Sequence, residues 1–419
     1  MNSFFARALG CRLNQYEIDV LSSELKNIGL TRVDANADIC IINTCTVTHV
    51  ADRKSRKEIR KIIRNNPNAF VVVTGCFAQT EREELNKISG IDLIVDNSKK
   101  EKIVDLLYNR GVISNIPGKI LNYNVDRSRP AIKIQDGCNH LCTYCKVRIA
   151  RGRSRSNNIN EIVETVKHLS NKGFEEVVFT GVNIGDYNWK GVRLAGLLKK
   201  VLSETSNIRI RLSSIEPTDI TEELFEVMSD TRICKYFHIP LQSGSNRILQ
   251  LMKRPYTREK YIDKINRLKS ISADVVIGAD VIVGFPGETD SDFNDTFNLL
   301  KENNIFYLHV FKYSKRENTE AALLPDEVDE ITKNKRSETL IKYRDESKYQ
   351  FFKTLINKEF DAIIEGKPAR DNLVTSLTDN YITVLVDRNS AQPYLKKNKR
   401  IIVTEFKDNV LIGKLKTNV

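Results

Sequence analysis

Three cysteines stand close together in residues 137–145, with the spacing C-x3-C-x2-C. They are Cys138, Cys142 and Cys145. Three thiolates on one short loop can bind three irons of a cubic iron–sulfur cluster, whereas an electron-transfer cluster ordinarily takes four. The missing ligand leaves one iron open to a small molecule, so the spacing predicts a [4Fe–4S] cluster at which chemistry takes place.

Two other readings of this loop are a zinc site and three unrelated buried thiols. A structural zinc ion needs a fourth ligand nearby. Only His140 offers one, and it lies inside the loop, where it cannot easily reach round to the metal. The cluster is therefore the favoured interpretation.

The first hundred residues alternate apolar strand-like runs with amphipathic helical stretches, which is typical of a parallel α/β domain. Cys11, Cys45 and Cys76 directly follow the first three expected strands. Ligands of an open parallel sheet sit outside the carboxyl ends of its strands. These three cysteines should therefore converge, and we expect a second cluster with an open iron. The expected strands are 4–9, 38–43, 70–74 and 91–95, and the expected helices are 15–28, 50–64, 81–88 and 100–108.

Small buried cysteines are also common near strands, so such a position alone is weak support for a metal site. Cys40 and Cys234 are interpreted in that way, as packed core residues. Three strand ends that each carry a cysteine beside polar loop residues are harder to explain by packing.

The middle of the chain repeats a strand–helix unit about six times, which predicts an incomplete (β/α)6 barrel. Barrel enzymes place their chemistry at the C-terminal ends of the strands. The expected strands are 131–135, 176–180, 208–213, 236–240, 275–283 and 307–313, with helices at 159–170, 194–203, 245–253 and 259–271.

Polar and glycine residues follow these strands and are candidates for cofactor binding. Glycines let the backbone approach a ligand, and the polar side chains can hold amino, carboxylate and ribose groups. Each motif alone is weak, because such turns use Gly and Pro anyway. Glu216 and Gln242 are expected to recognise the cofactor rather than to transfer protons. The candidates are Tyr144, Gly181, Asn183, Ser213, Glu216, Gln242 and Gly284.

From about residue 355 the apolar pattern changes to period two, with expected strands at 360–364, 381–386 and 401–406. About 65 residues of short strands suit a small barrel of the oligonucleotide-binding kind. An inert capping barrel is the alternative. The expected domains are 1–115, 124–354 and 355–419.

The net charge of +12 indicates an acidic partner, most often nucleic acid. Positive residues gather in 53–61, in 148–155 and in 396–400. One such run is more often a solvated face, but three of them, one next to the cysteine loop, favour RNA binding. The candidate RNA contacts are Arg53, Arg56, Arg151, Arg153 and Arg155.

The apolar runs are too short for a membrane span, which needs about 20 residues, or for a secretory signal. Eight cysteines in 419 residues do not form a disulfide scaffold. We therefore expect a cytoplasmic protein without a membrane contact, in a reducing compartment where thiolates are available for metal.

The motif Cys138-x3-Cys142-Thr143-Tyr144-Cys145 resembles that of the radical S-adenosylmethionine superfamily. The whole chain resembles the methylthiotransferases, which join a cysteine-bearing N-terminal domain, a radical barrel and a C-terminal TRAM barrel. Residues 14–17, Asn-Gln-Tyr-Glu, resemble the branch that modifies N6-threonylcarbamoyladenosine beside the tRNA anticodon. Alternatives are the branch acting on isopentenyladenosine and the branch acting on a ribosomal-protein aspartate. Further matching motifs are 10–13, 43–48, 74–76, 150–155 and 284–289.

The resemblance implies a fold, two [4Fe–4S] clusters and a mechanism. S-adenosylmethionine would bind the open iron at Cys138, Cys142 and Cys145, and an electron would cleave it to methionine and a deoxyadenosyl radical. The cluster of Cys11, Cys45 and Cys76 would hold the sulfur that is methylated and passed to carbon 2 of the base. The implied partners are tRNA and an electron donor of the flavodoxin or ferredoxin type.

Two rival functions from other classes remain. A non-catalytic iron–sulfur RNA-binding protein would account for the charge and the cysteines, but not for the polar residues at the barrel strand ends. A radical enzyme that modifies a protein side chain would need less positive charge.

Overall fold

The computed structural model describes residues 1–116 and 127–416. These residues form two compact units. The first holds residues 1–116, 136–155 and 316–319, and the second holds 127–135, 156–315 and 320–416. The cysteine loop thus groups with the N-terminal residues, although sequence order places it at the start of the barrel. The predicted boundary between 115 and 124 falls largely outside the described residues.

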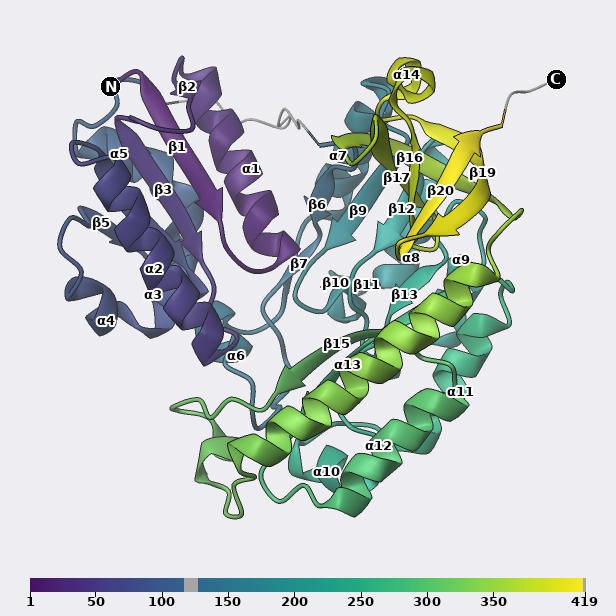
Figure 1. The fold of residues 1–419 in the computed structure, drawn as a ribbon. Helices are drawn as coiled ribbons and strands as arrows, with labels where there is room; N and C mark the ends of the chain where they lie inside the picture. The colour runs from purple at the N-terminus through teal and green to yellow at the C-terminus, as the bar shows by residue number, and fades with distance from the viewer. Residues whose placement is uncertain (117–126, 417–419) are drawn as a thin grey trace. The chain divides into compact units, whose positions relative to one another are not determined.

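The first unit is built on a parallel sheet with the strand order β2-β1-β3-β4-β5 (Figure 1). All six residues of β3 are buried, because helices cover both faces of a parallel sheet. Ile39 and Ile41 pack on one face with residues of α1 and α5. Cys40 and Ile42 pack on the other face with residues of α2 and α3. Cys40 is therefore a core residue, as predicted.

The bounds of this unit follow the predicted pattern closely. The short elements β2, α3 and α6 were not expected, and the predicted helix at 100–108 begins as a 3-10 helix. The elements are β1 (Ser3–Ala8), α1 (Arg12–Asn27), β2 (Thr31–Arg32), β3 (Ile39–Thr44), α2 (His49–Asn65), β4 (Phe70–Gly75), α3 (Cys76–Thr80), α4 (Arg82–Asn86), β5 (Leu93–Val95), η1 (Asn97–Lys102), α5 (Ile103–Asn109) and α6 (Val147–Arg151).

The second unit contains the predicted partial barrel. Its described strands form two parallel sheets, with the orders β12-β9-β6 and β13-β14-β15. Backbone hydrogen bonds join the two sheets, from Cys234 N to Ile210 O at 2.9 Å and from Ile215 N to His238 O at 3.1 Å. Sequential strands are thus neighbours in space. The strands are β6 (Ala131–Lys133), β9 (Glu176–Thr180), β12 (Arg209–Leu212), β13 (Tyr236–His238), β14 (Val276–Val283) and β15 (Tyr307–Lys312).

Helices cover one face of the β13-β14-β15 sheet. α11 and the long α13 both pack against β14. α13 also packs against β15 (Figure 1). The connecting elements are α7 (Ile159–Asn171), α8 (Leu194–Glu204), α9 (Glu222–Met228), α10 (Asn246–Leu251), α11 (Arg258–Lys269), α12 (Asp290–Glu302) and α13 (Glu330–Lys353), with short strands β7 (Gln135–Asp136), β8 (Arg155–Ser156), β10 (Asn188–Trp189) and β11 (Val192–Arg193).

The C-terminal residues form a closed barrel with the order β16-β17-β18-β20-β19, consistent with a TRAM domain. The sequence pattern predicted three of these strands and missed β17 and β20, in which polar residues or glycine interrupt the apolar pattern. No helix in the described part of the chain is long and apolar enough to cross a membrane. The elements are β16 (Glu359–Pro368), β17 (Leu373–Thr378), β18 (Thr383–Asp387), α14 (Arg388–Ala391), β19 (Asn398–Lys407) and β20 (Val410–Leu415).

A buried carboxylate joins the small barrel to the partial barrel within the second unit. Glu176 accepts from Arg211 Nε at 2.7 Å and from Arg209 Nε at 2.6 Å. Arg211 also donates to the carbonyl of Thr378 at 2.9 Å, and Arg209 donates to Asn398 Oδ1 at 2.9 Å. Burial alone would raise the pKa of Glu176, but the two guanidinium groups hold it well below its usual range.

Candidate iron–sulfur and cofactor sites

The thiols of Cys11, Cys45 and Cys76 lie where the sequence pattern placed them, after the ends of β1, β3 and β4. Gly10 has a φ of +86°, and a Cβ there would lie 2.5 Å from Cys45 Sγ. Burial raises the pKa of Cys45 to about 11, and the neighbouring Cys11 and Cys76 also raise it. The three thiols are therefore within electrostatic reach of one another.

These three residues fit an iron–sulfur cluster by their donor chemistry. Soft thiolates are the ligands that such clusters take, and a metal removes the thiol proton that burial otherwise retains. Cys45 also receives backbone hydrogen bonds from Val47 and Thr46, which favour its thiolate. Gly10 leaves space beside this sulfur that any other residue would fill.

The loop of Cys138, Cys142 and Cys145 folds back on the residues that follow it. The amide of Cys138 donates to the carbonyl of Gly152 at 3.1 Å, and that of Cys145 donates to the carbonyl of Cys142 at 3.1 Å. The amide of Val147, at the start of α6, donates to Cys145 Sγ at 3.4 Å. Such amide donors stabilise a thiolate, so this loop also suits a cluster.

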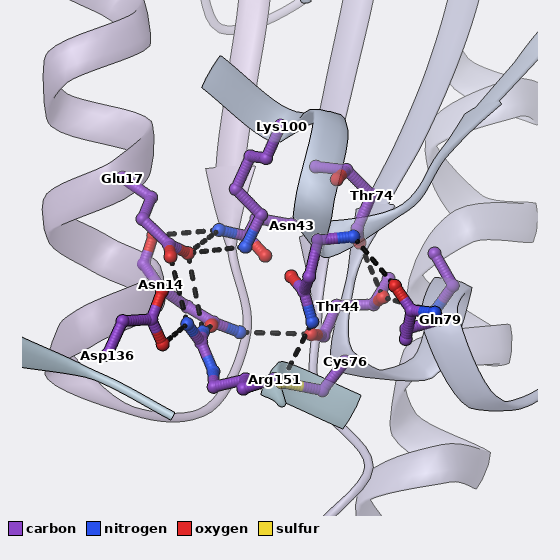
Figure 2. A network of polar contacts seen from close by, with 12 residues as sticks. Asn14, Glu17, Asn43, Thr44, Thr74, Cys76, Gln79, Lys100, Asp136 and Arg151 are labelled. Atoms are coloured by element: carbon purple, nitrogen blue, oxygen red, sulfur yellow. Dashed lines mark hydrogen bonds and ion pairs between the residues drawn. The ribbon is translucent and has the colours of Figure 1, made fainter. Parts of the chain in front are cut away.

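A buried arginine links the cysteine loop to the first helix of the same unit, as Figure 2 shows. Arg151, at the end of α6, donates to Glu17 Oε1 at 3.0 Å and to Asp136 Oδ1 at 2.9 Å. It also donates to Asn14, and Lys100 donates to Glu17 Oε2 at 2.6 Å. Asn14 and Glu17 share one face of α1, because they are three residues apart. Both follow Cys11 closely in sequence.

Asn97 makes a second link between the two cysteine sets. Its side-chain amide donates to the carbonyl of Ala150 at 2.6 Å and lies 3.8 Å from Cys76 Sγ. Lys146, next to Cys145, donates to Glu81 Oε1 at 2.7 Å. These contacts lie within the first unit, so its own folding holds the cysteine loop against the edge of the sheet that carries the other thiols.

Arg316 lies beside the residues that follow Cys45 and contacts them directly. The arginine is buried, pairs with Asp52, and donates to Thr46 Oγ1 at 2.7 Å. Sequence reasoning missed Asn97, Lys100 and Arg316, because nothing in their neighbourhoods in the sequence marks them. Asn14 and Glu17 belong to the 14–17 motif already noted in the sequence, but their contacts with Arg151 were not expected.

The structure corrects one of the predicted RNA contacts. Arg151 is only 5% exposed, and both of its terminal nitrogens face protein partners. It therefore cannot contact phosphate in this conformation, so that prediction is wrong. Arg53 and Arg153 are exposed, and Arg155 is exposed with Asp136 at 3.8 Å. Arg56 is half-buried, with its guanidinium 5.7 Å from the ring centre of Phe77.

Replacing Arg151 by glutamine should lower the free energy of unfolding by about 3 kcal/mol, because breaking a buried ion pair leaves an uncompensated charge. Glu17 would keep Lys100, but Asp136 would lose its closest cation. Urea unfolding followed by circular dichroism measures the change. The matched control is Arg153→Gln, at an exposed position two residues away. Equal stability of the two variants would contradict the role assigned to Arg151.

The second unit brings several predicted cofactor residues together at the C-terminal ends of β9 and β12. Asn183 Oδ1 accepts from the amides of Gly185 at 3.2 Å and Glu216 at 3.4 Å. Its Nδ2 donates to Asp219 Oδ2 at 2.7 Å. Ser213 Oγ is buried and has no hydrogen-bond partner among the described residues. An unpartnered hydroxyl at this rim fits a ligand that supplies the missing hydrogen bond.

The remaining candidates are spread over several strand ends of the second unit and the cysteine loop. Gln242 has a φ of +64°, and its amide donates to the carbonyl of Asp280 at 2.8 Å. The carboxylate of Glu216 is paired with Arg254, which is buried. The amide of Gly284 donates to Glu288 Oε2 at 2.6 Å. Gly181 packs against Gln135, where a Cβ would lie 2.8 Å from Oε1. Tyr144 belongs to the first unit, with the cysteine loop.

Two family models match the chain. The Radical SAM superfamily matches residues 132–300, and the uncharacterised protein family UPF0004 matches residues 3–96. A curated relative from Bacillus subtilis, the threonylcarbamoyladenosine tRNA methylthiotransferase MtaB, is 38% identical over 90% of this chain and 88% of its own length. The chain belongs to the radical SAM methylthiotransferase family.

Other relatives agree with this assignment. The MtaB of Aquifex aeolicus is 38% identical over 90% of this chain and 94% of its own length. A tRNA-2-methylthio-N(6)-dimethylallyladenosine synthase from Clostridium novyi is 33% identical over 88% of this chain and 87% of its own. The solved structure of TsrM from Kitasatospora setae, a radical S-adenosylmethionine methyltransferase, has a TM-score of 0.54 at 14% identity, covering 74% of this chain and 75% of that one. That likeness shows the fold.

Membership of this family makes the chain a radical SAM enzyme and implies a [4Fe–4S] cluster and S-adenosylmethionine. The TsrM structures contain a [4Fe–4S] cluster in one case and an analogue of S-adenosylmethionine in another. The thiol loop and the polar rim described above are the parts of this chain that suit those two groups.

Proposed function

We infer that this chain is a tRNA methylthiotransferase that adds a methylthio group to carbon 2 of N6-threonylcarbamoyladenosine beside the anticodon. This inference rests on the sequence identity between the chain and its named relatives. Those named MtaB reach 38% identity over 90% of the chain, whereas those named for the dimethylallyl base reach 33% and 34%.

Cys138, Cys142 and Cys145 would hold the radical cluster, and the rim of the partial barrel would hold S-adenosylmethionine. A [4Fe–4S] cluster bound by this loop supplies the electron that cleaves S-adenosylmethionine. The amide of Val147 on Cys145 Sγ stabilises the thiolate form of that ligand. Ser213 Oγ and the side chain of Asn183 are suited to fixing polar groups of the cofactor.

Cys11, Cys45 and Cys76 would hold a second [4Fe–4S] cluster, which carries the sulfur to be transferred. Their convergence at one edge of the sheet supports this role. Arg151 is placed to balance the negative charge of bound thiolates. Burial alone would lower its pKa, but Cys76, Glu17 and Asp136 raise it well above its usual value. Arg151 and Asn97 would hold the loop of Cys138, Cys142 and Cys145 in a fixed position relative to the three N-terminal cysteines.

The exposed face of α2 is our candidate for the phosphate backbone of tRNA. Helical spacing places Arg53, Lys57, Arg60 and Arg64 along one exposed side. Arg153 and Arg155 add exposed charge beside the cysteine loop. Phosphate contacts of this kind should weaken steeply as the salt concentration rises. The target base would leave the anticodon stack to reach the reaction site.

Two further proposals follow from a tRNA substrate. The enzyme would work in the cytoplasm, where tRNA is modified. Cleavage of S-adenosylmethionine consumes one electron per event, so a one-electron donor of the flavodoxin or ferredoxin type would serve it.

Mass spectrometry of tRNA nucleosides from cells with and without the gene tests the proposed function. We expect 2-methylthio-N6-threonylcarbamoyladenosine to disappear on deletion, its precursor lacking the methylthio group to accumulate, and a plasmid copy to reverse both changes. Loss of the methylthio group from isopentenyladenosine instead would assign the chain to that branch. Unchanged tRNA with loss of a ribosomal-protein modification would assign it to the protein-modifying branch.

A further inference from the structure

Three polar side chains meet on the face of the β13-β14-β15 sheet that the helices leave open. Asp280 Oδ1 lies 3.1 Å from His238 Nε2 and 3.0 Å from His309 Nδ1. Asp280 and His309 are direct partners in the parallel register, and His238 pairs with Gly278. Because side chains alternate across a strand, Gly278 and Asp280 share one face. The cluster therefore results from strand register alone.

The open face has distinct layers along the strands. Near the N-terminal ends, the ring of Tyr236 stacks on Tyr381 of the small barrel at 4.6 Å, and Tyr307 donates to the Tyr381 carbonyl at 2.9 Å. The cluster of His238, Asp280 and His309 forms the next layer. Ile282 and Phe311, a registered pair, come last, towards the C-terminal ends where barrel enzymes act. The cluster thus lies between the tyrosine rings and the C-terminal ends of the strands.

On this face, β15 carries two side chains that are accessible to solvent. Leu308 is buried on the side covered by α13, whereas the side chain of His309 is 61% exposed and Phe311 is 37% exposed. His309 and Phe311 are two residues apart, about 6–7 Å along the strand. An accessible imidazole and an accessible phenyl ring on one strand form a surface that can stack a flat base and contact a polar group on it.

The hydrogen-bond partners of the two imidazoles fix their donor atoms. An ionised carboxylate can only accept, so the ring nitrogens that face Asp280 carry protons. Burial alone would raise the pKa of Asp280, but the hydrogen bonds from His238 and His309 hold it well below its usual range. Asp280 therefore orients His309, as carboxylates do for imidazoles elsewhere.

We propose that His309 binds the carboxylate of the N6-threonylcarbamoyl group while Phe311 stacks against the adenine that carries it. This inference rests on the proposed function and names the group that selects the substrate. The threonyl moiety ends in a carboxylate, for which an imidazolium is a charge-assisted donor. An isopentenyl group has no charge and would gain nothing from His309. His309 is thus a specificity-determining residue, and Asp280 is a positioning residue.

Binding of two anticodon stem-loop RNAs to the full chain tests the proposal. One RNA carries N6-threonylcarbamoyladenosine beside the anticodon, and the other carries its methyl ester, which lacks the charge. The wild-type protein should bind the free acid about tenfold more tightly, equivalent to about 1.4 kcal/mol. His309→Gln should bind both equally, with the loss confined to the acid. His168→Gln, a histidine on α7 outside the cluster, should behave like the wild type.

Three outcomes would overturn the proposal. The wild type could bind acid and ester alike, His309→Gln could keep the full preference, or it could weaken both RNAs to the same extent. The same three residues are also a possible ligand set for a divalent metal. One equivalent of Zn²⁺ bound by the wild type and lost in His309→Gln, with the acid preference unchanged, would replace anion binding by a metal site. These binding measurements do not require turnover. A failure of the proposed function would be seen in a separate assay, as no methylthiolation of the acid RNA.

Discussion

The Cys45→Ala variant is expected to cleave S-adenosylmethionine and yet to transfer no methylthio group to RNA. Cys45 belongs to the trio at the sheet edge, where burial and the neighbouring thiols act on it together. Removing it leaves two ligands for the proposed second cluster, while the loop of Cys138, Cys142 and Cys145 is untouched. Methionine and 5′-deoxyadenosine formation should continue, and methylthiolated nucleoside should fall below detection.

The matched control for this variant lies in β3, the strand that Cys45 follows. Cys40→Ala removes a thiol of β3 that packs in the apolar core, so both reactions should persist. Methylthiolation by Cys45→Ala at the wild-type rate would show that the N-terminal trio carries no sulfur for the reaction.

The Cys142→Ala variant should lose both reactions. Cys142 is the middle ligand of the loop, and two remaining thiolates cannot hold three corners of a cluster. S-adenosylmethionine would then have no electron source, so methionine, deoxyadenosine and methylthiolated nucleoside should all be absent. Iron held by the N-terminal trio should remain. Anaerobic assays with a chemical reductant, read by liquid chromatography and mass spectrometry, measure all three products.

Cys234→Ala controls for the loss of a thiol in the second unit. Cys234 is fully buried beside Glu176, and burial raises its pKa to about 12, so it is not a ligand candidate. This variant should keep both reactions. Formation of deoxyadenosine by Cys142→Ala at the wild-type rate would contradict the assignment of the loop.

The positions of the three N-terminal candidate ligands could be predicted from the sequence, because parallel strands impose a simple rule. A residue that follows a strand of a parallel sheet must lie at its carboxyl edge, whatever its neighbours are. Cys11, Cys45 and Cys76 obey this rule after β1, β3 and β4. The apolar runs of β3 and β4 are long enough to locate these edges within a residue or two.

Arg151 shows why a charge pattern is a weaker guide. The run of arginines after the loop predicts an exposed basic surface, and Arg153 and Arg155 do form one. Arg151 differs because Glu17 and Asp136, which come from separate segments, surround it. Only the folded unit brings these carboxylates together, so no local pattern distinguishes the buried arginine from its exposed neighbours.

The cluster at Asp280 could not be predicted for a related reason. His238, Asp280 and His309 are isolated polar residues in three largely apolar strands. Which of them meet depends on the stagger between strands, and a shift of one residue would turn His309 to the opposite face. The pattern of apolar residues sets strand positions but not this stagger.

The claim that each set of three cysteines binds its own cluster is tested most directly by the content of iron and acid-labile sulfide after anaerobic reconstitution. The wild-type chain should hold about eight irons, because each trio binds one [4Fe–4S] cluster. Cys45→Ala and Cys142→Ala should each retain about four. A wild-type value of about four irons, unchanged by Cys45→Ala, would contradict the account, because the N-terminal thiols would then hold no cluster.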